Sequence, residues 1–294
     1  MNRNLTKYIV GLLLFGSNGV VASFIDLPSH YIVLWRSILG GLMLTGLFFL
    51  TGNRITCHRH KKDLLFVILS GAAMATDWLL LFEAYSRIGV SLGMIINYCG
   101  PVIVILFSAF IFKEKITVKT IFALGFALSG AILISWQGAN SGINKLGLIL
   151  AALSAFAYAA MVIFNKLSKE IKGTENATIQ LLSTMVIVTV YVALKHGLHF
   201  VIPSKSIFPV LWIGLLNTGL GCYFYFSSLS SLPAQTVAVF GYLEPLSAVF
   251  FSVLILQERM LLLQIIGSAL ILIGTILLNI RTHKPLDQNR SISS

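Results

Sequence analysis

Residues 97–134 read NYCGPVIVILFSAFIFKEKITVKTIFALGFALSGAILI, and residues 241–278 read GYLEPLSAVFFSVLILQERMLLLQIIGSALILIGTILL. A shift of 144 positions, from 97 to 241, aligns the two stretches. The aligned pairs are Tyr98 with Tyr242, Pro101 with Pro245, Ser108 with Ser252, Glu114 with Glu258, and Gly130 with Gly274. Matches between leucines are common in apolar segments, but matches of proline, glutamate and glycine are not. The chain therefore contains an internal repeat.

The composition of the whole chain indicates a lipid environment. Of 294 residues, 57% are hydrophobic and only 11% are charged, and the mean hydropathy is +0.90. An average soluble domain carries about 25% charged residues, so this chain has too few to cover a globule in water. The net charge of +11 does not indicate a nucleic-acid partner, because the basic residues lie in short clusters between apolar runs.

Ten segments are long and apolar enough to cross a bilayer as helices, which takes about 20 residues each. They are 7–24, 30–50, 64–85, 90–112, 117–136, 145–165, 177–195, 207–227, 234–256 and 261–280. The backbone of a spanning segment must satisfy its own hydrogen bonds, so only helices or a closed barrel are suitable. The runs lack the alternation of barrel strands. We expect an all-α integral membrane fold with the lipid bilayer as its surroundings.

Ten helices divide into two repeats of five, and we place these at 1–138 and 139–282, followed by a cytoplasmic tail at 283–294. Because five is odd, the second repeat must be inserted upside down relative to the first. With the N-terminus in the cytoplasm, 15 of the 21 Lys and Arg residues lie in inside segments, 5 lie outside, and Arg36 lies within a span. The positive-inside rule thus predicts a multi-pass protein of the cell membrane with both termini cytoplasmic.

The sequence shows no pattern for a metal, a cofactor or ATP. Cys57, Cys99 and Cys222 are far apart and have no metal-ligand spacing. No nucleotide-binding P-loop is present. A membrane enzyme would need a polar catalytic cluster near one interface, and none is apparent, so we do not expect an enzyme. Inverted repeats are a common architecture of secondary transporters, with the substrate site near the midplane.

The signature of a proline, an apolar helix, a glutamate, a turn and a helix with a late glycine occurs twice. Its residues are Pro101, Glu114 and Gly130 in one copy, and Pro245, Glu258 and Gly274 in the other. With this signature, its length and its ten spans, the chain resembles the EamA family of the drug/metabolite transporter superfamily. The resemblance covers nearly the whole chain. It implies ten helices with both termini cytoplasmic, and members that mostly export amino acids and related metabolites.

The resulting functional hypothesis is a secondary transporter that exports amino acids or related small metabolites by alternating access, with a small-molecule substrate and protons as partners. The alternatives are an importer of another small solute, such as a nucleoside or a vitamin, a solute channel, or an integral membrane enzyme. The oligomeric state is left open.

Three acidic residues and one basic residue lie within the expected spans, and intramembrane charge is costly enough to indicate function. Arg36 and Asp77 have matching depths, so we expect them to form an ion pair, with either a structural or a transport role. Glu244 lies near the midplane of its span. It precedes Pro245, which frees a backbone carbonyl one turn earlier. A carboxylate beside such a break could bind a substrate ammonium or a coupling proton; the alternative is a packing role.

Aromatic and amide side chains of the spans are further candidates for lining a substrate cavity, the alternative for each being helix packing. Trp78 and Phe82 lie four residues apart and therefore share a helix face. With Glu244, the candidates are Trp78, Phe82, Asn97, Tyr98, Tyr158, Asn217, Tyr223 and Tyr242. Pro101 and Pro245 are the expected helix breaks.

Overall fold

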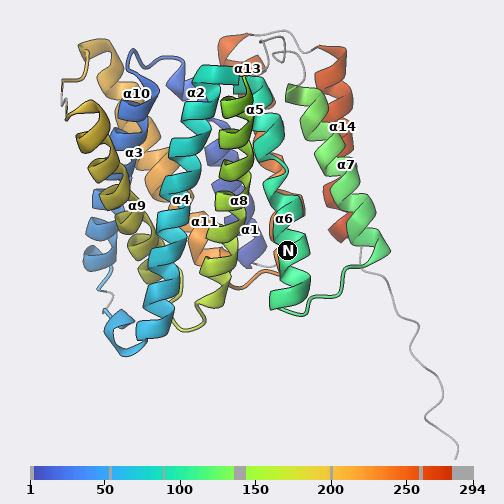
Figure 1. Cartoon of the computed structure of the whole chain (residues 1–294), viewed down its shortest axis with the longest axis horizontal. Coiled ribbons are helices and arrows are strands. Elements are labelled where there is room, and N and C mark those ends of the chain that lie inside the picture. The colour runs from blue at the N-terminus through green and yellow to red at the C-terminus, as the bar shows by residue number, and fades with distance from the viewer. Residues whose placement is uncertain are drawn as a thin grey trace, which may run out of the picture.

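The structure is a computed structural model that describes residues 3–52, 55–88, 90–135, 144–198, 201–257 and 261–279. Across these residues the regular elements are all helices, and they form a bundle (Figure 1). The helices of the first half are α1 Arg3–Gly16, α2 Asn18–Ala22, α3 Ser29–Leu50, α4 Lys61–Ile88, α5 Val90–Asn97, α6 Gly100–Ile111 and α7 Val118–Ser135. Those of the second half are α8 Lys145–Leu167, α9 Gly173–His196, α10 Ile207–Leu211, the π-helical segment η4 Trp212–Leu220, α11 Gly221–Leu229, α12 Ala234–Gly241, α13 Leu243–Leu256 and α14 Leu262–Asn279. Two short 3-10 turns, η1 Cys57–Arg59 and η3 Ser204–Ser206, lie in connections.

These elements build ten membrane-crossing units within the described residues. Eight are long and apolar enough to span a membrane, and two, Val118–Ile134 and Leu262–Leu278, are shorter apolar helices. The prediction of ten transmembrane helices in two inverted five-helix repeats is confirmed. The expected boundary at 138–139, the tail at 283–294 and Glu258 all lie outside the described residues.

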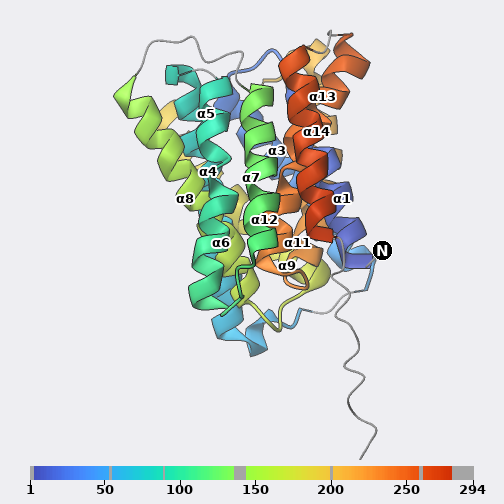
Figure 2. The same cartoon turned by 90° about the vertical axis from the view of Figure 1, so that its right-hand side faces the viewer.

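The fifth and tenth helices, α7 and α14, lie side by side along their length (Figures 1 and 2). Their backbones approach closely because small residues face each other, as is common between membrane helices. A Cβ atom on Gly130 would lie 2.4 Å from the carbonyl oxygen of Gly267, and one on Gly274 would lie 2.5 Å from that of Ala123. Under the 144-residue shift, Gly130 corresponds to Gly274 and Ala123 to Gly267, so the two contacts are repeat equivalents.

Three of the spans predicted as single helices are interrupted. The first breaks at Ser17 between α1 and α2, the fourth between Asn97 and Gly100, and the ninth at Tyr242. The last two interruptions lie just before Pro101 and Pro245. Each proline lacks an N–H group, so the carbonyl four residues earlier has no helical donor. Both interruptions place non-helical backbone in the middle of a span.

The chain ends and connections divide between two faces. The beginning of α1, the end of α14 and the α3–α4, α6–α7 and α8–α9 connections lie at the lower end of the bundle (Figure 1). We call this end the N-terminal face. The largest buried cluster of side chains draws on α1, α3, α4, α6, α8, α9, α11 and α12, and includes Tyr8, Leu12 and Phe226.

Candidate functional site

A central cavity of about 90 Å³ lies where the fourth and ninth spans are interrupted. It is lined by Leu81, Tyr85, Met94, Asn97, Tyr98, Pro101, Tyr158, Gly241, Tyr242 and Glu244. Five of the nine cavity candidates from the sequence therefore meet here, from α5, α8, α13 and the two breaks. The lining carries one carboxylate and four tyrosines, and no lysine, arginine or histidine.

Glu244 lies in the first turn of α13 and lines this cavity. The carboxylate makes no hydrogen bond or ion pair with any described residue. Besides tyrosines, two ionisable side chains, Arg36 of α3 and Asp77 of α4, lie within electrostatic reach of it. A charged carboxylate within the membrane that has no protein partner costs free energy, and such a residue is therefore a candidate for binding a ligand or a proton.

The carboxylate of Asp77 belongs to a separate polar cluster beside the cavity. Asn97 Nδ2 donates to Asp77 Oδ1 at 3.0 Å and to Ser154 Oγ at 3.1 Å. Asp77 is 5% exposed and Ser154 is fully buried. The cluster ties α4 and α8 to the end of α5, directly before the break at Tyr98. Asn97 thus links the break to α4 and α8, which pack closely against each other.

The expected ion pair between Arg36 and Asp77 is not formed. Arg36 Nε donates to Thr218 Oγ1 at 2.9 Å, and the guanidinium carbon lies 4.2 Å from the ring centroid of Trp78. The prediction compared only the depths of the two residues along the membrane normal. It took no account of how each helix is rotated about its own axis. Consecutive residues of a helix point about 100° apart, so with Trp78 facing Arg36, Asp77 points towards Asn97 instead.

Tyr98 and Tyr242, the repeat-equivalent residues at the two breaks, form an asymmetric pair. Tyr242 Oη donates to the carbonyl oxygen of Tyr98 at 2.7 Å, and the ring centroids are 6.1 Å apart. The Tyr98 hydroxyl is buried and has no hydrogen-bond partner among the described residues. Nearby, the hydroxyl groups of Tyr158 and Tyr225 are 3.5 Å apart, and Tyr8 Oη donates to the carbonyl oxygen of Val237 at 2.9 Å.

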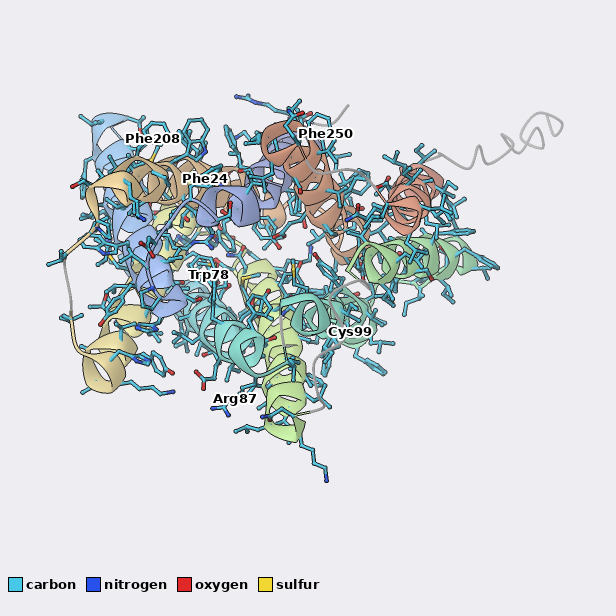
Figure 3. All side chains as sticks on the ribbon, turned by 90° about the horizontal axis from the view of Figure 1, so that it is seen from above. Phe24, Trp78, Arg87, Cys99, Phe208 and Phe250 are labelled. Atoms are coloured by element: carbon cyan, nitrogen blue, oxygen red, sulfur yellow. The ribbon has the colours of Figure 1, made fainter. Side chains whose placement is uncertain are left out.

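The remaining cavity candidates lie elsewhere. Viewed from the face opposite the N-terminal face, Trp78 is inside the bundle, whereas Arg87, Phe208 and Phe250 lie at its edge (Figure 3). Phe82 packs against Tyr85, with ring centroids 5.6 Å apart. Tyr223 lies under Lys7 of α1.

Asn217 is buried in η4 and joins that segment to the break in the first span. Its Nδ2 donates to Ser17 Oγ at 2.8 Å and to Asn18 Oδ1 at 3.1 Å. Its role in the structure is thus to connect two irregular segments, outside the cavity lining.

Sequence reasoning missed several residues of this region. Leu81 and Tyr85 follow Asp77 at four-residue intervals, and this spacing places them on one helix face, so the pattern could have identified them. Ser154 and Met94 are ordinary residues of apolar segments and carry no such signal.

The two repeats are packed differently at the two faces. At the N-terminal face α6 packs against α12, whereas the equivalent described parts of α5 and α13 at the other face share almost no contact. Polar contacts reinforce the closed end: Glu114 Oε1 accepts from the Ala234 N–H at 2.9 Å, and Thr120 Oγ1 donates to Gln235 Oε1 at 2.7 Å. In addition, Lys166 Nζ donates to the carbonyl oxygen of Leu232. Helix packing and polar contacts therefore hold the two interrupted spans together at the N-terminal face.

The sequence matches the EamA-like transporter family over residues 6–136 and 145–280. The chain belongs to this family. As an EamA-like protein it is similar to YxxF of Bacillus subtilis, named an uncharacterized transporter, at 25% identity over 94% of this chain and 89% of that protein. It is also similar to YicL of Salmonella typhimurium, named an uncharacterized inner membrane transporter, at 21% identity over 96% and 97%.

A solved crystal structure shares the fold with a TM-score of 0.81, at 15% identity, over 94% of this EamA-like chain and 96% of the other. Together with the family match, these relatives support a membrane transporter as the function. Among the described residues, no group of three or more His, Cys, Asp or Glu side chains could hold a metal ion.

Proposed function

We propose that the protein is a secondary transporter that exports amino acids or related small metabolites by alternating access. The observation that carries this proposal is Glu244, which lines the central cavity and whose carboxylate makes no hydrogen bond or ion pair with any described residue. A substrate ammonium is its natural complement, since hydrogen bonds between ionised groups are short and about twice as strong as neutral ones. The adjacent break at Tyr242 gives the backbone carbonyls that could share that ammonium.

The closed N-terminal face supports the alternating-access part of the proposal. We assign this face to the cytoplasm from the excess of basic residues there, so the conformation described is closed towards the cytoplasm. Exchange of the packing of α6 on α12 for packing of α5 on α13 would close the opposite face and open the N-terminal face. We also take 1–138 and 139–282 as the two moving repeats and 283–294 as a cytoplasmic tail.

Proton coupling at Glu244 would drive export. The carboxylate would release a proton when it binds a substrate ammonium and would take up a proton when the ammonium leaves, so each cycle exchanges the two cations. The driving force would be proton entry, and no ATP would be needed.

Flux measurements in proteoliposomes test the proposal. The purified protein is supplied with labelled amino acids, nucleosides and vitamins, and saturable counterflow is expected for amino acids. A pH gradient should accelerate net flux, and Glu244→Gln should abolish that acceleration while counterflow persists. Glu83→Gln is the matched control, because Glu83 lies at the outer edge of the bundle in an ion pair with Arg87 at 2.7 Å.

Each alternative predicts a different result. Non-saturable flux without counterflow would indicate a channel, and counterflow of nucleosides or vitamins alone would indicate a carrier of another solute. If Glu244→Gln leaves gradient-driven flux unchanged, Glu244 has a structural role and facilitated diffusion becomes the mechanism.

A further inference from the structure

We infer that Glu114 is a gating residue, whose carboxylate keeps the N-terminal face closed by capping α12 across the boundary between the repeats. This role rests on the proposed function, because it presupposes alternating access, and it belongs to a residue that does not line the central cavity. The capped helix is short: α12 spans Ala234–Gly241 and ends directly before the break at Tyr242. Because of this break, no continuous helix ties α12 to α13, and α12 is free to move as a separate element.

The first turn of α12 has no cap of its own. A helix leaves its first N–H groups without partners, and a side-chain oxygen of the preceding residue usually accepts from one of them. The preceding residue here is Pro233, which makes no capping bond. Instead, Glu114 Oε1 accepts from the Ala234 N–H at 2.9 Å, and Oε2 accepts from the Gln235 N–H at 3.4 Å. A carboxylate also interacts favourably with the partial positive charge of a helix N-terminus. The cap of α12 therefore comes from the other repeat.

The backbone directly before Glu114 has an unusual conformation. Lys113 has a φ of 55°, in the left-handed region that is unfavourable for residues with a side chain. Its repeat equivalent, Gln257, has a φ of 58° and is followed in the sequence by Glu258. Such conformations persist where the surrounding structure requires them, and they cluster at functional sites. The left-handed residue before the glutamate is thus a feature of both repeats, and in the first repeat the carboxylate that follows it reaches α12.

Further polar contacts hold the start of α12 to the same region of the first repeat. Thr120 Oγ1 of α7 donates to Gln235 Oε1 at 2.7 Å, and Gln235 Nε2 donates to the carbonyl oxygen of Lys115 at 2.8 Å. Lys115 lies in the connection between α6 and α7, as Glu114 does. Movement of α12 away from α6 would therefore require these bonds to break together with those of the Glu114 carboxylate.

Asp63 offers a matched comparison at the same face. Its Oδ2 accepts from the Lys169 N–H at 2.7 Å and from the Glu170 N–H at 2.6 Å, so it also joins the two halves through a pair of backbone donors. These donors lie in the connection between α8 and α9. The chemistry of the two carboxylates is therefore alike, but only the bonds of Glu114 involve an interrupted span.

The experiment measures from which side of the membrane a cysteine can be labelled. Vesicles of both orientations receive a membrane-impermeant thiol reagent, without any substrate, and the three native cysteines are replaced by alanine. Val237→Cys reports on the N-terminal face, because Val237 of α12 is fully buried in the closed arrangement. Met94→Cys reports on the opposite face, because Met94 lines the cavity from α5.

The expected result is a shift of labelling from one face to the other. A hydrogen bond to a charged group contributes enough to change a two-state ratio by about 10- to 100-fold. Glu114→Ala removes both bonds, so labelling at Val237→Cys relative to Met94→Cys should rise by about that factor. Glu114→Gln retains the shape and one acceptor oxygen, so the rise should be smaller. Asp63→Asn should leave the ratio unchanged.

Several results would overturn this role. A rise at Val237→Cys without a fall at Met94→Cys would mean that α12 only unwinds locally, and a rise at both positions would mean a general loosening of the bundle. An unchanged ratio in Glu114→Gln, which keeps the test valid if Glu114→Ala fails to fold, would also contradict it, as would an equal change in Asp63→Asn. Absence of saturable flux for every solute would overturn the proposed function instead, and this is a separate result because the labelling needs no substrate.

Discussion

Gly130 of α7 gives the sharpest test of the repeat packing. In Gly130→Ala the new Cβ atom would lie 2.4 Å from the carbonyl oxygen of Gly267, 2.8 Å from Ile271 Cγ1 and 3.0 Å from the Ile271 nitrogen. Ordinary contact begins at 3.4 Å, so α7 and α14 must separate locally by 3.4 − 2.4 = 1.0 Å. Two of the three obstacles are backbone atoms, which cannot turn aside as a side chain could.

The matched control is Gly125→Ala, on the same helix. Nothing lies within 4 Å of a Cβ atom at Gly125. Both substitutions gain the same helix propensity, about 1 kcal/mol for alanine over glycine, so the gain cancels in the comparison. Overpacking typically costs about 1–3 kcal/mol. Gly130→Ala should therefore be less stable than Gly125→Ala by about that amount.

The assay is equilibrium unfolding of the purified variants in mixed micelles, with thermal unfolding in one detergent as a second measure. Gly274→Ala, the repeat equivalent of Gly130→Ala, should show a similar loss because its Cβ atom would lie 2.5 Å from the carbonyl oxygen of Ala123. Equal stability of Gly130→Ala and Gly125→Ala would refute the close contact between α7 and α14.

Three further predictions follow from side-chain contacts. The charge exchange Arg36→Asp with Asp77→Arg should not restore the folded yield lost in either single variant, because the two side chains do not pair; recovery in fluorescence-detected gel filtration would contradict the structure. Asn97→Ala should destabilise the protein by about 1.5–3 kcal/mol in micelle unfolding, because Asp77 loses its donor; wild-type stability would argue against the bond. Burial and the neighbouring Glu175 carboxylate raise the pKa of the Cys57 thiol, so in a variant with Cys57 as the single cysteine, maleimide labelling should be slow at pH 7 and quicken as pH rises. Glu175→Gln should lower that pKa and accelerate labelling at constant pH, and an unchanged rate would exclude the electrostatic effect.

Much of the fold could be predicted from the sequence because it depends on distributed signals. Apolar length marks each span, and repeated proline, glutamate and glycine residues identify the two halves. The interruption at Ser17 and the π-helical segment η4 carry no such signal. They are stabilised by individual side-chain bonds, such as that of Asn217 to Ser17, between segments 200 residues apart.

The site could be predicted only in part, for a related reason. Glu244, Tyr98 and Tyr242 lie at or beside the breaks set by the prolines, so their gathering follows from the repeat alignment. Arg36 and Asp77 were matched by depth alone. Depth gives the position of a residue along the helix axis, but the direction of its side chain depends on helix rotation, which only the packed bundle defines.

The close contacts between α7 and α14 also bear on how such a chain could arise. If the two halves descend from one five-helix unit, a single substitution in the gene of that unit would have appeared twice in the assembled pair. A larger residue at the position of Gly130 would then have obstructed both equivalent contacts at once. Fusion of the halves into one chain lets the two sites change separately. Gly274 faces Ala123 at one site, and Gly130 faces Gly267 at the other, so the two equivalent sites already differ at one position.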